Sequence, residues 1–241
     1  MPRPSSPAAV RAVVLALAPP APGLSRDTSI PCLERLGGSR LIDRLLETMH
    51  AVGLPAPLVV SDESAHRALR ATLGHSMSVV AVPGGREAAL RAVLDRCDEE
   101  LLLLHDAERA LTPPEVVREV WGALREDDDA VVPVVAMTDS VKEVRAEGLR
   151  NIDRASLAGL QSPRLMRRGV LESALDDDGR PADAGGFDEI RAALDRGARV
   201  RTVHGSHSGF AVLDRLSLWQ AQISLGLARD TSHRQGLTRR S

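Results

Sequence analysis

The residues with the clearest chemical potential follow a run of four leucines. Residues 101–104 are all leucine, and His105, Asp106, Glu108 and Arg109 come directly after them. A run this apolar, between a helical pattern and a Pro-Pro helix start, is typical of a buried central strand in a parallel sheet. Ligands of open α/β sheets bind outside the carboxyl ends of such strands, which makes Asp106 and Arg109 candidate site residues. A turn cap and a surface ion pair would explain the same two residues, and this segment alone leaves both interpretations open.

The elements around this strand alternate in type along the first half of the chain. Short apolar runs predict strands, and apolar residues at helical spacing predict helices. We expect strands at 12–18, 57–61, 78–82, 100–104 and 130–135, and helices at 40–52, 62–73, 86–96 and 113–125. Ser61 and Thr112 are the expected N-caps of the second and fourth of these helices. The alternation predicts an α/β fold with a doubly wound, mostly parallel sheet.

The pattern changes after residue 138. Segments 140–145 and 149–154 alternate polar and apolar residues around Ala146-Glu147-Gly148, which predicts an exposed β-hairpin. The remaining expected elements are strands at 157–161, 198–204 and 209–213, and helices at 164–175, 187–196 and from 214 to about 228. We therefore expect one domain over residues 11–229 with an inserted arm at about 138–155, a flexible leader over 1–10 and a disordered tail over 230–241.

The composition excludes several classes of protein. A formal net charge of −2 and an aromatic content of 2% argue against nucleic-acid binding, which relies on basic patches and aromatic stacking surfaces. No stretch reaches the roughly 18 consecutive apolar residues of a membrane span, and residues 1–9 lack the apolar segment of a secretory signal. Cys32 and Cys97 have no neighbours at metal-ligand spacing, so we expect no zinc site and a reducing, cytoplasmic compartment.

Three further polar clusters have a plain interpretation beside a functional one. The acidic run 127–129 is expected to be a surface loop rather than a metal site. The segment 176–179 is expected to be a solvated turn rather than a calcium loop, because no bidentate Glu follows at the required spacing. His204 and His207 have no carboxylate or Cys neighbours, so we expect ordinary turn residues.

Three segments together resemble one enzyme family. They are LLLLHDAERALTPP at 101–114, DDAVVPVVAMTDSVKEV at 128–144 and NIDRASLAGLQSPRLM at 151–166. The chain resembles the 2-C-methyl-D-erythritol 4-phosphate cytidylyltransferases of non-mevalonate isoprenoid synthesis from Ala12 to about Leu227. The resemblance implies a Rossmann-like fold and the transfer of a cytidylyl group from CTP to methylerythritol phosphate, with Mg²⁺ and release of pyrophosphate. It also implies a homodimer whose subunits exchange their hairpin arms.

The resemblance assigns a nucleotide site around the end of the leucine strand. It places Asp106 near the metal and the ribose, with Arg109 as its companion arginine and both as the catalytic residues. Gly84, Gly85 and Arg86 match the family's second glycine motif, near the cytosine.

Further roles fall on the first loop and on the arm. Gly23 and Arg26 are the nucleotide-binding candidates that the first loop retains. Ser140 and Arg154 match substrate-binding residues of the arm and would act in the partner's site. Ser162 matches the Thr of the family's Thr-Pro-Gln and is a third substrate-binding candidate.

The first loop departs from the family pattern. The family's loop is rich in glycine, carries an arginine and ends in Pro-Lys, whereas this chain has APPAPGLSRDTSIPC at 18–32. Cys32 therefore stands in place of the lysine, and Arg26 replaces the arginine only with a shift of one residue. Pro19, Pro20 and Pro22 lack the N–H groups that a triphosphate cradle needs. Ala211 stands in place of a second lysine, and Ala88 or Ala89 in place of a Ser or Thr.

These departures lead to three hypotheses. In the first, the chain is a divergent family member with weak or no transfer activity that binds a phosphorylated ligand or another protein. In the second, it is a working cytidylyltransferase in which Arg26 and residues outside the motif replace the phosphate clamp. In the third, it is a structural subunit that pairs with an intact paralogue. Loss of one charge-stabilising donor typically costs ~3 kcal/mol of transition-state stabilisation, so we favour the first.

Overall fold

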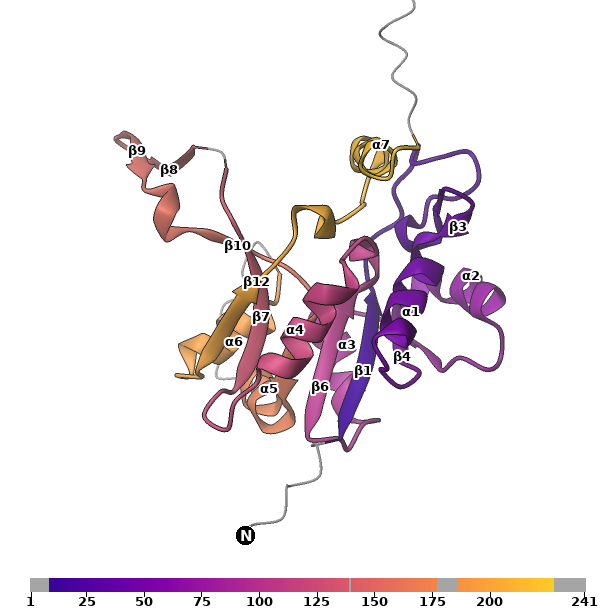
Figure 1. The fold of residues 1–241 in the computed structure, drawn as a ribbon, viewed down its shortest axis with the longest axis horizontal. Helices are drawn as coiled ribbons and strands as arrows, with labels where there is room; N and C mark the ends of the chain where they lie inside the picture. Colours follow the sequence, from indigo (N-terminus) through magenta and orange to yellow (C-terminus); the bar gives the residue numbers. More distant parts are fainter. Residues whose placement is uncertain (1–8, 139, 177–185, 228–241) are drawn as a thin grey trace, which may run out of the picture.

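The computed structural model describes residues 9–138, 140–176 and 186–227. Its centre is an eight-stranded sheet with the strand order β10-β7-β11-β6-β1-β4-β5, in which β12 also pairs with β7 (Figure 1). The strands are β1 (Val10–Ala16), β4 (Leu58–Asp62), β5 (Val79–Val82), β6 (Leu101–Asp106), β7 (Ala130–Ala136), β10 (Ala158–Leu160), β11 (Arg164–Arg167) and β12 (Val200–His204). Only β10 and β11 run against the other strands of this sheet. The predicted α/β fold with a mostly parallel sheet is confirmed.

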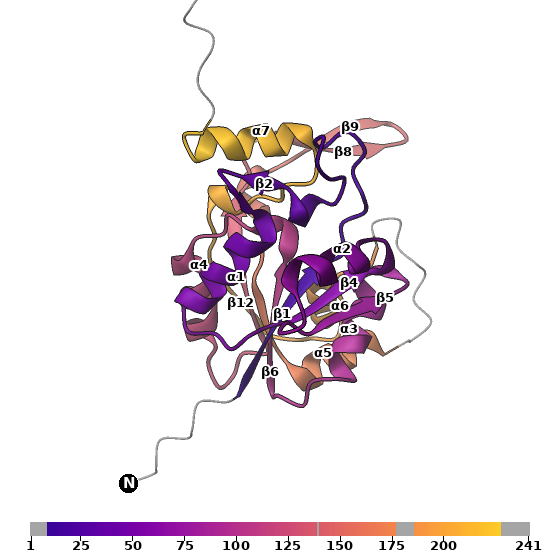
Figure 2. The same ribbon diagram turned by 90° about the vertical axis from the view of Figure 1, so that its right-hand side faces the viewer.

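Helices cover both faces of the sheet (Figures 1 and 2). One core receives side chains from α1 (Leu41–Ala51), α2 (Glu63–Leu73) and α4 (Pro114–Ala123), and the other from α3 (Gly85–Leu94), α5 (Arg168–Leu175) and α6 (Glu189–Asp195). The leucine run of β6 serves both cores, because Leu101 and Leu103 lie in the first and Leu102 and Leu104 in the second. Successive side chains of a strand point to opposite faces, which is why a strand buried on both sides is apolar throughout.

The carboxyl ends of β1 and β6 form a topological switch point. From β1 the chain moves outwards through β4 and β5, and β6 then returns to the opposite side of β1. Open α/β sheets bind ligands in the crevice that such a reversal leaves. Leu15 of β1 lies opposite Asp106 of β6 in the register, so the two strands end side by side.

The segment predicted as a helix at 164–175 is divided into a strand and a helix. Residues 164–167 form β11, which lies antiparallel between β6 and β7, and α5 begins at Arg168. Leu165 packs into one core and Met166 into the other, as in any strand buried on both faces. The helix prediction was therefore wrong for its first four residues.

The strand predicted at 209–213 is absent. Residues 207–209 form the short 3-10 helix η4, and the chain then continues in an irregular segment to α7 (Arg215–Ser224). The Val212 amide donates a hydrogen bond of 2.8 Å to the Glu108 carbonyl instead of joining a sheet ladder. This bond fixes the segment against the end of β6.

Two predicted helix caps also differ from the structure. Asp62, not Ser61, caps α2 by accepting a hydrogen bond of 2.9 Å from the Ser64 amide. Ser61 is fully buried at the end of β4. Thr112 makes no cap, because its hydroxyl donates to the Arg109 carbonyl at 2.8 Å.

The predicted hairpin is present and extends away from the body of the molecule (Figure 1). It consists of β8 (Val141–Arg145) and β9 (Gly148–Ile152), which pair antiparallel. Its apolar side chains Val144 and Leu149 are 81% and 71% exposed. They face each other across the ladder and have no cover from their own domain.

Some expectations fall outside the described residues. These are the tail over 230–241, the turn at 177–179 and most of the leader over 1–10, although Val10 already belongs to β1. Among the described residues, no helix has both the length and the apolar character needed to cross a membrane.

Candidate active site

Asp106 and Arg109 lie together at the switch point, as the sequence predicts. Asp106 is the last residue of β6, and Arg109 ends the 3-10 turn η2 (Ala107–Arg109) that follows it. The Arg109 Nε lies 3.7 Å from one Asp106 carboxylate oxygen, and Arg86 Nη1 donates to the other at 2.7 Å. Burial raises the pKa of Asp106, but the charge and hydrogen bond of Arg86 outweigh it and hold the pKa below its usual range. Asp106 is therefore a carboxylate at neutral pH.

Arg86 reaches Asp106 from the start of α3. It follows Gly84 and Gly85, which have φ values of +101° and +74°. Only glycine adopts such backbone angles readily, so the pair permits the sharp turn from β5 into α3. The turn brings Arg86 across the carboxyl edge of the sheet to Asp106. Of the three residues predicted from the second glycine motif, Arg86 therefore contacts Asp106, and Gly84 and Gly85 form the turn that precedes it.

Sequence reasoning missed the residue that holds Arg86 in place. Glu189, fully buried in the first turn of α6, accepts two hydrogen bonds of 2.7 Å from Arg86 and one of 2.8 Å from Arg164. Burial raises the pKa of Glu189, but both arginines outweigh it and the net direction is downwards. The only sequence signal was Asp188-Glu189 at a helix start, where Asp188 caps α6 through the Ile190 and Arg191 amides.

Ser162 is fully buried and supports Asp106 from behind. Its hydroxyl accepts a hydrogen bond of 3.2 Å from the Asp106 amide and lies 3.2 Å from His105 Nδ1. Burial lowers the pKa of His105 to about 4, which keeps the ring neutral at physiological pH. Ser162 therefore positions Asp106 in this structure, and its predicted role in substrate binding stays a prediction.

Arg109 ties the site to the segment before α7. Its Nη1 donates to the Gly209 carbonyl at 2.8 Å, and burial lowers its pKa from the usual arginine value. The guanidinium stays charged, because arginine remains protonated in proteins. The Gly209 contact and the Val212 bond together hold Ala211 near this edge of the sheet.

Five backbone amides of the first loop donate hydrogen bonds to oxygens of the same loop. Gly23, with φ +82°, completes a turn that is closed by a hydrogen bond of 3.1 Å from the Leu24 amide to the Ala21 carbonyl. Within the same loop, backbone or side-chain oxygens also accept from the amides of Ala21, Asp27, Thr28 and Ile30. Arg26 lies exposed on this loop, and Cys32 is buried in the core. These internal bonds engage five amides of the loop, which therefore do not point towards a phosphate.

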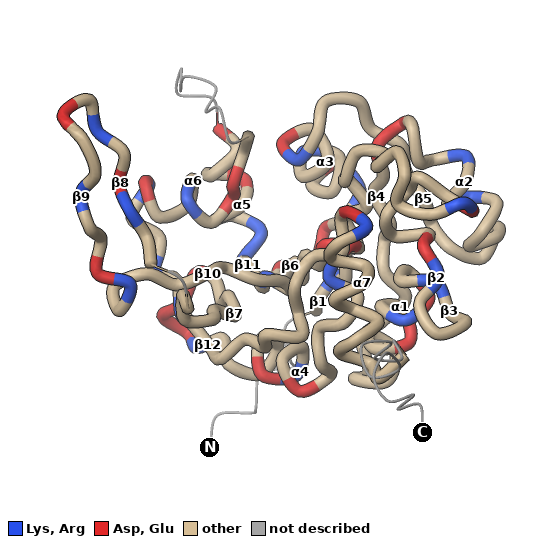
Figure 3. Tube along the Cα trace, turned by 90° about the horizontal axis from the view of Figure 1, so that it is seen from above, with Lys and Arg blue, Asp and Glu red and all other residues tan. Residues whose placement is uncertain are grey.

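The structure does not bring the arm residues to this site within one chain. Ser140 and Arg154 are exposed at the base of the arm, and Arg154 Nη1 donates to the Thr138 carbonyl at 2.8 Å. Figure 3 shows the arm, with charges of both signs, standing clear of the sheet. Their predicted action in a partner's site stays a prediction.

The acidic run 127–129 stabilises a sheet edge. Asp128 accepts hydrogen bonds of 2.5 and 3.1 Å from Arg201, and Asp129 accepts one of 2.7 Å from the Arg199 amide. The bond with Arg201 is the main cause of the lowered pKa of Asp128. These contacts agree with the surface-loop interpretation.

A Mg²⁺ ion, which the resemblance implies, would find one carboxylate here. Asp106 offers the oxygen that faces Arg109, whereas both Glu189 oxygens already accept from arginine. Within residues 9–138, 140–176 and 186–227, no three His, Cys, Asp or Glu side chains lie close enough to hold a metal. The residues therefore fit only a magnesium ion held mostly by phosphate oxygens and water, with Asp106 as a single protein ligand.

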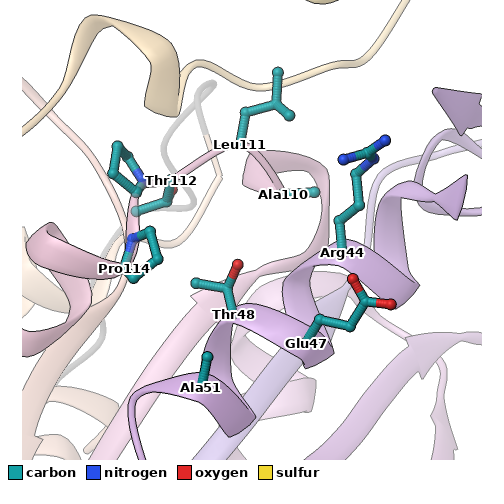
Figure 4. A pocket seen from close by; sticks show the side chains of 9 residues that line it. Arg44, Glu47, Thr48, Ala51, Ala110, Leu111, Thr112 and Pro114 are labelled. Carbon is teal, nitrogen blue, oxygen red and sulfur yellow. The ribbon is translucent and has the colours of Figure 1, made fainter. Parts of the chain in front are cut away.

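A separate pocket of about 340 Å³ lies between α1 and the start of α4 (Figure 4). Arg44, Glu47 and Thr48 line it from α1, facing residues 110–114. The Arg44 guanidinium is already bonded to the Leu36 carbonyl, at 3.0 and 2.6 Å. Asp106, Arg86 and Arg109 do not line this pocket, so it is not part of the candidate site.

A doubly wound sheet whose helices cover both faces, with a crevice at its switch point, places the chain in the class of Rossmann-like α/β proteins. Within that class, the chain belongs to the 2-C-methyl-D-erythritol 4-phosphate cytidylyltransferase family (IspD), whose family profile matches residues 30–227. The matched residues start after β1 and most of the first loop. The proline-rich part of the first loop therefore lies outside the match, whereas Cys32 and Ala211 lie inside it.

Relatives and solved structures agree with this assignment. The chain is 37% identical over 191 residues to the 2-C-methyl-D-erythritol 4-phosphate cytidylyltransferase of Frankia casuarinae, which covers 75% of this chain and 68% of the relative. It is 34% identical to that of Saccharopolyspora erythraea, over 80% of this chain and 90% of the relative. The crystal structure of the 4-diphosphocytidyl-2C-methyl-D-erythritol synthase from Anaerococcus prevotii has the same fold, with a TM-score of 0.74, 19% identity and coverage of 90% and 96%.

Proposed function

We propose that this chain is a divergent member of its family in which cytidylyl transfer from CTP to methylerythritol phosphate is weak or lost. The observation that carries the proposal is the first loop. Five of its amides are bonded within the loop, and four of its residues (Pro19, Pro20, Pro22 and Pro31) are prolines without an N–H group. A triphosphate binds where several free amides and cations converge, whereas this loop engages five of its amides internally and has Cys32 in place of the expected lysine.

The remaining site would act on the reacting phosphate through charge. In the family's reaction a phosphate oxygen of methylerythritol phosphate displaces pyrophosphate from CTP, and bound Mg²⁺ would neutralise charge on the phosphates. Arg109 would face the developing negative charge, and Asp106 would hold the ion beside it. Arg86 fixes the Asp106 carboxylate, and Glu189 fixes Arg86. These residues would serve the reacting phosphate, whereas the lysine expected in the first loop to balance the leaving pyrophosphate is replaced by Cys32.

The proposal is tested by pyrophosphate release from CTP, Mg²⁺ and methylerythritol phosphate, with the Frankia relative assayed in parallel. We expect turnover at least about a hundredfold below that of the relative, the loss typical of one missing oxyanion-type donor. We also expect CTP with Mg²⁺ to bind no tighter than about the millimolar range. Turnover comparable to the relative, or micromolar binding of CTP, would refute the proposal.

One observation favours the alternative of a working cytidylyltransferase. Arg26 is exposed on the first loop, so its guanidinium is available to a ligand. In that case Arg26→Ala would abolish turnover, whereas the exposed Arg118 of α4 could be replaced by alanine without effect. Turnover that is absent in the unchanged protein excludes this alternative.

We further propose that the protein acts in the cytoplasm as a homodimer joined through the arms, without nucleic acid or membrane as a partner. If activity is lost, the arm would serve to pair this chain, as a structural subunit, with an intact paralogue.

A further inference from the structure

The helix α7 has an apolar face that its own chain leaves uncovered. Leu216, Trp219 and Ile223 recur at three- and four-residue spacing along the helix, and they are 70%, 56% and 49% exposed. Residues with this spacing lie on one face of a helix. No Asp, Glu, Lys or Arg occurs from residue 216 to residue 224, so the face carries no charge of its own. A contiguous exposed apolar face marks an interaction site.

The helix that carries this face is held firmly on the protein. Leu218 and Ala221, on its opposite side, pack into the first core. A capping box closes its start, because the Asp214 carboxylate accepts a hydrogen bond of 2.8 Å from the Ser217 amide and the Ser217 hydroxyl accepts one of 3.0 Å from the Asp214 amide. The apolar face therefore belongs to an anchored and capped helix.

The hairpin of β8 and β9 carries the second uncovered apolar surface. Val144 lies opposite Leu149 in the ladder, and Lys142 and Asn151 share their face because side chains alternate along a strand. Lys142 donates a hydrogen bond of 2.5 Å to Asn151, so the polar members of this face bond to each other. The other face holds charged side chains that pair among themselves, which are Glu143, Arg145 and Arg150. The hairpin therefore offers one face that suits an apolar, uncharged surface.

The two surfaces do not cover each other within one chain. The hairpin and α7 lie far apart, on opposite sides of the molecule (Figures 1 and 3). A two-fold axis that passes between them brings each hairpin towards the α7 of a second copy. The hairpin alone has two five-residue strands, whereas a stable interface uses about 20–30 residues a side. A dimer joined through the arms therefore needs a further surface, and α7 supplies one.

We infer that the α7 face of Leu216, Trp219 and Ile223 is the surface that receives the hairpin of a second copy of this chain, with Val144 and Leu149 packed against it. The inference rests on the homodimer proposed above and identifies the surface that the arm occupies. The contact occurs twice in the dimer, once for each arm. Trp219 lies at its centre, where a large aromatic side chain contributes most to an interface.

The first test is the dissociation constant of the dimer, measured by sedimentation of the full chain. Leu216→Asp with Trp219→Asp places two charges on the α7 face, and we expect the constant to rise at least about tenfold, since truncation of a central aromatic contact costs more than a tenfold change in affinity. The matched control is Arg215→Asp, which changes the net charge by the same amount at an exposed residue of the same helix. It should leave the constant nearly unchanged.

The second test reads the surroundings of Trp219 by fluorescence. The chain has two tryptophans, so Trp121→Phe leaves Trp219 as the only one. In this background we expect the emission maximum to shift to the red when residues 141–152 are deleted, because removal of the arm returns the indole ring to water. Arg150→Ala, on the charged face of the hairpin, should leave the emission maximum in place.

The outcomes separate this inference from the proposed function. A weakened dimer together with the red shift supports the inference. A dimer that the folded α7 variant leaves intact overturns the role of α7 and leaves the homodimer standing. An arm-deleted protein that stays dimeric with unchanged emission assigns α7 to another occupant, such as a second α7, and also overturns it.

Two further results are decisive in the same way. A monomeric unchanged protein overturns this inference and the homodimer together, whereas pyrophosphate release alone judges the proposed loss of cytidylyl transfer. If the α7 variant does not fold, as judged by its thermal transition, the emission of Trp219 decides, because that measurement leaves α7 unchanged.

Discussion

At the scale of single residues, the site depends on a buried network of two arginines and one glutamate. Glu189 is fully buried and neutralises Arg86 and Arg164 through hydrogen bonds of 2.7–2.8 Å. Removing one partner of a buried pair leaves an uncompensated charge, which costs about 3–5 kcal/mol. We therefore expect Glu189→Ala to lower the free energy of unfolding by about that amount in urea denaturation.

The matched control is Glu87, which pairs with Arg91 on the surface of α3, where both side chains are 47% exposed. Exposed pairs contribute about 0–1 kcal/mol, so Glu87→Ala should change the free energy of unfolding very little. Equal and small losses for the two variants would contradict the assigned role of Glu189.

A second residue-scale prediction concerns the pH dependence of stability. Glu108 binds its proton more tightly in the folded state, with a pKa raised from 4.5 to about 7, so its contribution to stability falls as pH rises between these values. The contribution of His105 to stability changes with pH in the opposite direction. Its pKa falls from 6.5 to about 4 on folding, so its contribution to stability falls as pH decreases between these values. Each change corresponds to roughly 3 kcal/mol, so the two largely cancel between about pH 4.5 and 6.5.

Replacing Glu108 isolates the histidine. In Glu108→Gln the free energy of unfolding should rise with pH over this window, whereas the unchanged protein should show a flatter profile. Denaturant titrations at several pH values measure both profiles. Parallel profiles for the two proteins would mean that Glu108 titrates normally in the folded state.

The sequence predicts the residues of this site unevenly. Asp106 and Arg109 follow directly from the apolar strand before them, because local pattern and position agree. Glu189 lies far along the chain, and a Glu in the first turn of a helix is usually a surface residue near the helix dipole. Only the fold shows that α6 turns this side chain inwards towards Arg86.

At the scale of elements, β11 is a second feature that local sequence pattern does not predict. Four residues give too short a pattern to distinguish a strand from the start of the helix that follows it. The structure resolves the ambiguity through pairing on both sides, with β6 and with β7. The long apolar strands and the hairpin were predictable because their patterns extend over more residues.

The first loop yields a prediction about restoring activity. A glycine-rich loop with Cys32→Lys and Ala211→Lys supplies the amides and cations that a triphosphate needs. We therefore expect the combined variant to show measurable pyrophosphate release. Groups that act on one transition state behave as a unit, so single replacements should have little effect. A folded combined variant that binds CTP without turnover would show that the chain lacks further catalytic groups.

At the scale of the whole molecule, the arm implies a second subunit. A two-stranded hairpin is marginally stable alone, and this one leaves Val144 and Leu149 largely exposed. The alternative to a second subunit is that the hairpin packs these side chains against its own domain, but the arm extends away from the sheet (Figures 1 and 3). A two-fold symmetric exchange would cover both arms with one self-complementary interface. We therefore expect a homodimer in which Arg154 lies near the Asp106 strand end of the partner.

Sedimentation tests this assembly at micromolar concentration. The unchanged protein should sediment as a dimer, and deletion of Val141 to Ile152 should give a folded monomer, because the main sheet has no ladder with β8 or β9. Val144→Asp with Leu149→Asp should weaken the dimer with the arm still present, whereas Lys142→Ala on the same hairpin should not. A monomeric unchanged protein would contradict the exchange and would remove Ser140 and Arg154 from any shared site, because neither reaches Asp106 within its own chain.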